Sequence, residues 1–242
     1  MTLLSSNTFV PDNEPLVRPK LNGVADPRQA PLIGVDSQLP AVSASAQSPA
    51  AMRARFAMPP QWSPEVMREN RFTDRASADA AVLIPIVLRR EPMVLLTERS
   101  ANLSTHSGQI AFPGGRRDPE DASPEATALR EAHEEVGLAA SAVEVIGRLP
   151  VYVTGSAFII TPVVGLVDPR AQLSPNPGEV ADVFEVPLAF LLNPAHHERH
   201  AMLWQGVQRE WFAMPYQDEG KERYIWGATA GMLRNLYRFL VV

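Results

Sequence analysis

The chain contains no cysteine. Without thiols it forms no disulfide bond, carries no cysteine nucleophile and offers no thiolate ligand to zinc. Disulfide-stapled domains, cysteine-dependent hydrolases and zinc-thiolate modules are therefore excluded. The absence also agrees with a reducing compartment, and we expect a cytoplasmic protein.

Long apolar runs and an excess of positive charge are missing as well. No hydrophobic stretch approaches the ~20 residues of a transmembrane helix, and the first residues, MTLLSSNTFVPDNEP, have neither a basic region nor an apolar core of signal-peptide length. Lysine and arginine total 22 against 27 aspartates and glutamates, a formal charge of -5. This balance argues against a nucleic-acid or membrane partner, and we expect a small-molecule partner.

Composition divides the 242 residues into two parts. Residues 1–65 hold ten of the 23 prolines, contain runs such as AVSASAQSPAAM and show no sustained period of 2 or 3.6. We expect this extension to be partly disordered or docked on the rest of the chain. Residues 66–242 carry the periodic apolar segments and predict one folded domain. We also expect the chain from about Asp74 onward to fold without the extension.

Short apolar runs separated by glycine, proline and charged turns predict many strands and few helices. Residues 80–88 (AAVLIPIVL) and 93–97 (MVLLT) predict a hairpin-like pair of buried strands. Further strands are predicted at 143–146, 151–153, 158–167 and 183–186, a short helix at 187–192 and a long helix at 224–241. Together these elements predict a mixed sheet flanked by helices, an α/β (α+β) fold.

The most informative stretch is 112–138, FPGGRRDPEDASPEATALREAHEEVGL, in which a glycine turn precedes a helix. Ser123 is suited to cap that helix, Pro124 to occupy its first position, and Gly137 to adopt the left-handed conformation after its end. One side of the helix is apolar and is expected to face the core. That side consists of Leu129, Ala132 and Val136.

Three glutamates share another face of this helix. At about 100° per residue, Glu131, Glu134 and Glu135 fall within roughly one 100° arc. Arg130 can pair with Glu134 four residues later. Glu131 and Glu135 face each other without a basic residue between them, which costs about 0.2–0.5 kcal/mol. On composition alone such a face is most often solvated, and the alternative is that a hard divalent cation neutralises the acids.

The order of residues in this stretch resembles the Nudix box. That pattern runs glycine, five residues, glutamate, seven residues, Arg-Glu, an aliphatic residue, any residue, Glu-Glu, any residue, glycine and an aliphatic residue. Residues 130–138 match it throughout, whereas the interval from Gly115 to Arg130 is one residue longer than the pattern. The early glutamate therefore has three candidate counterparts. They are Asp118, Glu120 and Asp121, of which we favour Asp121.

The upstream stretch 95–115, LLTERSANLSTHSGQIAFPGG, resembles the signature of the coenzyme A diphosphatase branch of that family, which also carries the longer loop. The matching positions are Leu95, Leu96, Thr97, Arg99, Ser100, Leu103, His106, Gly108, Gln109, Phe112 and Pro113. The branch has an arginine directly after the leucine aligned with Leu103, where this chain has Ser104. The resemblance covers roughly residues 80–242.

The resemblance implies a Nudix-like α/β/α sandwich with a mixed sheet between helices, and hydrolysis of a diphosphate bond assisted by Mg²⁺ or Mn²⁺. Carried over onto this sequence, the metal ligands are Glu131, Glu134, Glu135 and the carbonyl of Gly114. Glu131 is then expected to orient or deprotonate the attacking water, and Arg130 to orient a carboxylate. Such enzymes often add one acid from a later loop. The candidates here are Glu179 and, behind it, Asp182 and Glu185.

The upstream signature supplies the expected substrate contacts. Arg99, His106 and Gln109 are candidates to bind the substrate's phosphates, and their alternative role is to stabilise the loop before FPGG. The implied substrate is coenzyme A or an acyl-CoA, cleaved to 3′,5′-ADP and 4′-phosphopantetheine or its acylated form. ADP-ribose or another nucleoside diphosphate compound is the alternative substrate, and a nucleotide-binding domain without turnover is a third hypothesis. The sequence leaves a homodimer open.

Two further groups of residues attract attention by composition. The histidines of NPAHHERH resemble a metal cluster, but no pattern of acids accompanies them, so we interpret them as part of a solvated loop. They are His196, His197 and His200. Aromatic residues near the end of the chain either line an adenine or pantetheine site or belong to the core. They are Trp204, Trp211 and Tyr216.

Overall fold

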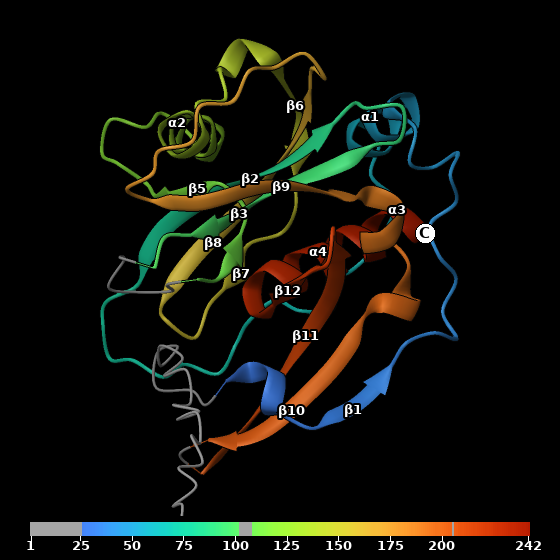
Figure 1. The fold of residues 1–242 in the computed structure, drawn as a ribbon, viewed down its shortest axis with the longest axis vertical. Helices are drawn as coiled ribbons and strands as arrows, with labels where there is room; N and C mark the ends of the chain where they lie inside the picture. Colours follow the sequence, from blue (N-terminus) through green and yellow to red (C-terminus); the bar gives the residue numbers. More distant parts are fainter. Residues whose placement is uncertain (1–25, 102–107, 205) are drawn as a thin grey trace, which may run out of the picture.

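The structure, a computed structural model, describes residues 26–101, 108–204 and 206–242. Within these ranges the chain forms one sheet of eight strands and one of four. Helix α2 (Pro124–Val136) lies on one face of the larger sheet, and α4 (Gly227–Val241) lies on the other face, between the two sheets (Figure 1). The predicted mixed sheet between helices is therefore confirmed.

The larger sheet has the order β4-β3-β2-β8-β6, with β5 beside β2, β7 beside β8 and β9 beside β3. Its strands are β2 (Ala78–Val87), β3 (Met93–Arg99), β4 (Ile110–Ala111), β5 (Gly114–Arg116), β6 (Val143–Arg148), β7 (Tyr152–Val153), β8 (Phe158–Val167) and β9 (Val180–Pro187). Strands β2 and β8 run parallel, and β2 and β3 form the predicted antiparallel pair, with Ile86 opposite Val94.

Strand β2 divides the hydrophobic core into two clusters. Because side chains alternate along a strand, a strand that is buried on both faces has a continuous apolar sequence. This is why AAVLIPIVL lacks the alternation of a half-exposed strand. The cluster shared with α4 contains Val82, Ile84 and Ile86, and the cluster shared with α2 contains Ala81, Leu83 and Val87.

The smaller sheet is antiparallel, with the order β1-β10-β11-β12. Its strands are β1 (Leu32–Val35), β10 (Glu198–Trp204), β11 (Val207–Asp218) and β12 (Lys221–Trp226). The predicted helix at 224–241 is wrong at its start, because Tyr224 and Ile225 belong to β12 and pair with β11. The helix begins only at Gly227, whose φ of 60° turns the chain out of the strand.

The described part of the N-terminal extension packs on the remainder of the chain. Helix α1 (Pro49–Ala57) is capped by Ser48 and places Met52, fully buried, in the core cluster of α4. Strand β1 pairs with β10 at the edge of the smaller sheet. The remaining short helices are η1 (Pro27–Gln29), η2 (Ala140–Ala142), α3 (Leu188–Leu191), which was predicted, and η3 (Pro194–His196). None of the helices in the described ranges combines the length and apolarity needed to cross a bilayer.

Candidate active site

Helix α2 begins and ends where its sequence predicts. The Ser123 hydroxyl accepts a hydrogen bond from the Ala126 N–H at 3.2 Å, and Gly137 has a φ of 69°. A Cβ atom at position 137 would lie 2.7 Å from the backbone nitrogen of Ser174, so this position requires glycine. Ala132 and Val136 are fully buried against the larger sheet, which fixes the rotation of the helix about its axis.

The three glutamates of α2 lie in different environments. Glu134 is exposed, Glu131 is half-buried, and Glu135 is only 3% exposed. Glu135 accepts a hydrogen bond from the Gly114 N–H at 3.2 Å, and its other oxygen lies 3.4 Å from Nη1 of Arg99. Of the three glutamates, only Glu134 is therefore solvated. The other two carboxylates point into the protein beside the glycine turn.

Burial changes the acidity of the two inner carboxyl groups. Loss of solvation is the main reason why the pKa of Glu135 rises to about 7. The Gly114 N–H and Arg99 oppose this rise in the pKa of Glu135, whereas the nearby negative charges of Glu131 and Glu179 add to it. Burial likewise raises the pKa of Glu131, against the opposing effect of Arg130. Burial is thus the main reason why both carboxyl groups bind their protons more strongly than usual.

Arg130 lies among the carboxylates and is itself held by Asp121. The Asp121 carboxylate accepts hydrogen bonds from Nε and Nη2 of Arg130 at 3.1 and 3.0 Å. This bidentate bond holds the pKa of Asp121 well below its usual range. Nη1 of Arg130 then lies 3.0 Å from Glu131 and 2.8 Å from Glu134, the latter being the predicted pair. Arg130 therefore lies where it could orient these carboxylates.

Glu179 reaches the same site from the loop before β9. The loop docks on the end of α2, where the Asn176 N–H donates to the Glu135 carbonyl at 2.9 Å. The Asn176 side-chain amide donates to Oε1 of Glu179 at 3.1 Å, which holds that carboxylate in place. Asp182 and Glu185, the other late acids, instead pair with arginines elsewhere, at 2.7 Å in each case.

The chemistry of this cluster fits a divalent cation, but the carboxylates are not drawn together. In the described ranges, no three histidine, aspartate or glutamate side chains meet closely enough to enclose a metal ion. Two arginines lie among these acids: Nη1 of Arg130 contacts both Glu131 and Glu134, and Nη1 of Arg99 lies 3.4 Å from one oxygen of Glu135. The raised pKa of the buried Glu135 is the observation that suits a cation, because a buried carboxylate needs a compensating positive charge.

A cavity of about 1170 Å³ opens beside the glycine turn. Arg99, Gln109, Gly114 and Gly115 line it at the end nearest the carboxylates. Two of the predicted phosphate contacts therefore face the cavity. The third, His106, lies outside the described residues, as does Ser104.

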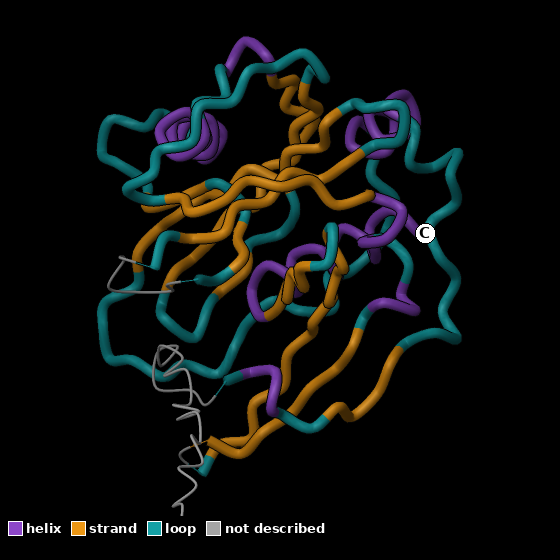
Figure 2. Tube along the Cα trace, in the orientation of Figure 1, coloured by secondary structure: helices purple, strands orange, loops and turns teal. Residues whose placement is uncertain are grey.

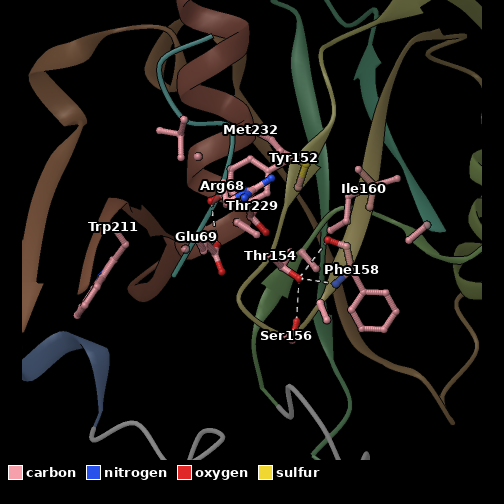
Figure 3. A pocket seen from close by; sticks show the side chains of 18 of the residues that line it. Arg68, Glu69, Tyr152, Thr154, Ser156, Phe158, Ile160, Trp211, Thr229 and Met232 are labelled. Carbon is pink, nitrogen blue, oxygen red and sulfur yellow. Dashed lines mark hydrogen bonds between the residues drawn. The ribbon is translucent and has the colours of Figure 1, made fainter. Parts of the chain in front are cut away.

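Sequence patterns missed most of the remaining cavity wall. Trp211 lies on one side of the opening and Phe158 and Ile160 on the other, with Glu69 between them (Figure 3). Of the predicted aromatic candidates, Trp211 lines the cavity, Tyr216 packs on Phe190 with ring centroids 5.0 Å apart, and the side chain of Trp204 lies outside the described part. No local signal identifies these residues, because they come from separate elements.

The histidines of NPAHHERH do not form the predicted solvated loop. His196 lies in η3 and His200 in β10, and His197, between these two elements, is fully buried. Its Nε2 is 2.8 Å from the Leu191 carbonyl and its Nδ1 is 3.1 Å from Nη1 of Arg234. His200 is 6% exposed and bonds Glu198 at 2.9 Å. The prediction was wrong because partners distant in sequence satisfy these polar side chains.

Comparison with known proteins agrees with this geometry. The model of the NUDIX domain family matches residues 78–205. Two relatives named uncharacterized Nudix hydrolase NudL come from Yersinia pestis (strain Pestoides F) and Yersinia pseudotuberculosis serotype O:1b (strain IP 31758). Each is 40% identical over 171 residues, which is 71% of this chain and 84% of the relative. A solved Nudix hydrolase from M. smegmatis, RenU, is 26% identical with a TM-score of 0.40, over 53% of this chain and 80% of that chain.

A glutamate-bearing helix against a glycine turn, in a mixed sheet between helices, defines a Nudix-type hydrolytic site, and the chain belongs to the Nudix family. It is a Nudix hydrolase, an enzyme of the pyrophosphohydrolase type. Enzymes of this family generally use divalent metal ions.

Proposed function

We propose that this hydrolase cleaves the diphosphate bond of coenzyme A or its acyl thioesters, with Mg²⁺ or Mn²⁺ as cofactor. The observation that carries the proposal is the contact between Arg99 and Glu135 at 3.4 Å. Arg99 belongs to the upstream signature of the coenzyme A branch, and Glu135 belongs to the box helix. Both motifs therefore serve one site, at the end of one cavity.

In this proposal the acids hold the metal and activate water. Glu131, Glu134 and Glu135 are the ligands from α2, Glu179 is the ligand from the late loop, and Gly114 adds its carbonyl. A divalent ion bound there would polarise the phosphorus and lower the pKa of an attacking water. Glu131, half-buried beside Gly115, would be placed to accept a proton from the attacking water. We choose Glu131 as the base because of its position. The pKa values of coupled carboxylates belong to the group and so do not identify the base.

Arg99 and Gln109 bind the phosphates of the substrate, because both line the cavity at the carboxylate end. His106 joins them in this proposal. Arg130 acts indirectly in this proposal. Its guanidinium donates a hydrogen bond to Asp121 and forms ion pairs with Glu131 and Glu134. Its role is to position carboxylates rather than to touch substrate.

A substrate panel tests the proposal. The purified protein is incubated with Mg²⁺ or Mn²⁺ and with coenzyme A, ADP-ribose or an adenine dinucleotide, and products are separated by chromatography. We expect 3′,5′-ADP and 4′-phosphopantetheine from coenzyme A at the highest kcat/KM. A preference for ADP-ribose, which has the same scissile linkage, overturns the coenzyme A assignment and favours the alternative.

A nucleotide-binding domain without turnover remains the hypothesis of a different class. The presence of Glu131, Glu134 and Glu135 together on α2 favours catalysis. Binding of coenzyme A without any product in the presence of Mg²⁺ or Mn²⁺ would decide for the binding domain. Sedimentation of the active protein would show whether a homodimer forms.

A further inference from the structure

Arg223 on β12 is a buried cation that joins the two sheets. Its side chain is only 7% exposed and pairs with acids from three different strands. They are Glu98 on β3 at 3.0 Å, Asp182 on β9 at 2.7 Å and Asp218 on β11 at 2.8 Å. Strands β3 and β9 belong to the larger sheet, whereas β11 and β12 belong to the smaller sheet, which lies below it in the view of Figure 2. One guanidinium therefore holds strands of both sheets.

Two of these acids lie opposite each other on neighbouring strands. Glu98 and Asp182 are directly opposed in the antiparallel pairing of β3 with β9, so their side chains share one face of the sheet. Like charges at such positions destabilise a sheet unless a cation neutralises them. Arg223 contacts both carboxylates, and Nζ of Lys221, also on β12, lies 2.6 and 3.7 Å from them. Cations from the smaller sheet thus hold this end of β3 beside β9.

The active site begins one residue beyond this pair of acids. Because side chains alternate along a strand, Glu98 and Arg99 point to opposite faces of β3. Glu98 meets the smaller sheet, and Arg99 reaches Glu135 of α2 on the other face, at 3.4 Å. The register with β9 shifts at this point, so that Arg99 is opposite Val180 and Ala181 is the extra residue of a β-bulge. Bulges beside active sites re-aim side chains, which makes the aim of Arg99 sensitive to the pairing of β3 with β9.

The loop before β9 is tied to the same place. The Ser100 N–H donates to the Glu179 carbonyl at 2.8 Å, so the backbone after β3 holds the residue that carries the late carboxylate. Asp182 follows Glu179 by three residues, on the other side of the bulge. The position of Arg99 relative to Glu179 therefore depends on how closely β3 and β9 are held, and Arg223 bonds both strands.

We propose that Arg223 is a positioning residue for hydrolysis, which sets the spacing of β3 from β9 at the edge of the active site. This inference rests on the proposed function, in which Arg99 binds phosphate and Glu179 binds the metal. Without the guanidinium, Glu98 and Asp182 repel each other across the two strands, and the strands move apart. Each strand then displaces the binding residue at its end.

Truncating one acid at a time tests the two strands separately. Glu98→Ala releases β3, so we expect KM to rise about three- to tenfold while kcat stays within about threefold of the wild type, because Arg99 contributes to substrate binding. Asp182→Ala releases β9, so we expect the Kd for Mn²⁺, measured by calorimetry without substrate, to rise about three- to tenfold. Arg223→Met releases both strands and should raise both constants. KM is measured on whichever compound of the substrate panel the wild type cleaves fastest.

Glu185→Ala is the matched control. Glu185 lies on the same strand as Asp182, toward its other end, and pairs with Arg89 at 2.7 Å. Its truncation breaks an equally short ion pair of β9 and should leave KM and the Kd for Mn²⁺ within about twofold of the wild type. Arg223→Lys keeps the positive charge, and both of its constants should lie closer to the wild type than those of Arg223→Met. Thermal unfolding of each variant verifies that it is folded.

The outcomes separate this inference from the proposed function. Folded Glu98→Ala and Asp182→Ala proteins with wild-type KM and wild-type Mn²⁺ affinity overturn it, even if Arg223→Met does not fold. A lower unfolding midpoint of Arg223→Met with both constants unchanged shows a purely structural role and also overturns it. Arg99→Ala and Glu179→Gln test the proposed function itself. If the first leaves KM unchanged and the second leaves Mn²⁺ binding unchanged, the roles proposed for these two residues fail, and the positioning role fails with them.

Discussion

Gly115 leaves no room for a side chain beside Glu131: a Cβ atom at position 115 would lie 2.5 Å from Oε2 of that glutamate. Oε2 is the far end of a flexible side chain, so Gly115→Ala should displace the carboxylate without unfolding the sheet. Displacing a reacting group by about 1 Å can lower the rate on the order of 100-fold. We expect kcat to fall by about 10- to 100-fold while the thermal unfolding midpoint stays within error of the wild type.

The neighbouring glycine provides the contrast. A Cβ atom at position 114 would lie 2.5 Å from the Ala81 carbonyl and 2.6 Å from Cα of Val82, and neither backbone atom can rotate away. Gly114→Ala should therefore destabilise the pairing of β5 with β2 by about 1–3 kcal/mol, as overpacking does. Urea unfolding measures this loss. Equal stability losses in both variants would refute the distinction between the two glycines.

Glu135 is the inner carboxylate, and Glu135→Gln tests whether its charge is needed. The amide keeps the size of the side chain but removes the negative charge that a cation requires. We expect at least about a 100-fold fall in kcat, on the order of 3 kcal/mol in the barrier. Chelation of divalent ions should abolish wild-type activity, and added Mg²⁺ or Mn²⁺ should restore it.

The same helix offers a matched control for that substitution. Glu125 lies in the first turn of α2 and pairs with Arg148 at 3.2 Å. Glu125→Gln makes the identical chemical change away from the cluster and should leave kcat within about twofold of the wild type, because it touches no group near the reaction. Activity of Glu135→Gln close to that of Glu125→Gln would remove Glu135 from the proposed site.

Local signals predict the box helix well. A capping serine, proline in the first turn and a left-handed glycine act within a few residues of each end, so the bounds of α2 follow from sequence. The pair of Arg130 with Glu134 is equally local, since four residues make one helical turn. The burial of β2 on both faces follows from its continuous apolar run.

Contacts between distant segments are not predictable in this way. The ion pair of Arg99 with Glu135 joins residues 36 apart, and strand β1 pairs with β10 from the other end of the chain. The apolar run through Tyr224 and Ile225 suits a helix as well as a strand, and only the hairpin partner β11 decides for the strand. The cavity wall has the same origin, because Phe72 and Trp211 come together only in the folded chain.

The buried His197 should lower the stability of the folded chain in mild acid. Burial lowers its pKa from 6.5 to about 4, so between these values the unfolded chain binds a proton that the folded chain does not. Stability therefore falls as pH falls through this window, by about 2 kcal/mol between pH 7.5 and 5 for this group alone. Glu135, whose pKa is raised to about 7, changes stability in the opposite direction over the same range, so the contribution of His197 is measured as the difference between the wild type and a His197 variant in urea unfolding at the two pH values.

His197→Gln removes the titrating ring and keeps a polar group near Leu191 and Arg234. The variant is expected to be less stable at pH 7.5, because the packing of the ring against Tyr237 is lost. Its further loss on going to pH 5 should be smaller than that of the wild type by about the same 2 kcal/mol. If the variant loses as much as the wild type, other groups cause the acid sensitivity.

Arg234 makes the chain from Asp74 onward depend on the segment before it. This guanidinium is 2% exposed and pairs with Asp36 at 2.9 Å and Glu65 at 2.8 Å, both of which precede residue 74. Deleting residues 1–73 would remove both carboxylate partners of Arg234 and would also remove Met52 from the core. These contacts argue against the sequence-based expectation of independent folding, and we expect the deletion variant to be insoluble or to unfold without cooperativity.

A second substitution separates the charge from the packing. Arg234→Met in the deleted chain removes the unpaired guanidinium while keeping an unbranched side chain of similar length. If the buried charge is the main penalty, the double variant should regain soluble expression or a cooperative urea transition that the deletion alone lacks. If the loss of α1 and β1 dominates, Arg234→Met will not rescue the chain, and restoring residues 26–73 will be required. A deleted chain that unfolds at the wild-type urea midpoint would show that neither contribution holds the fold together.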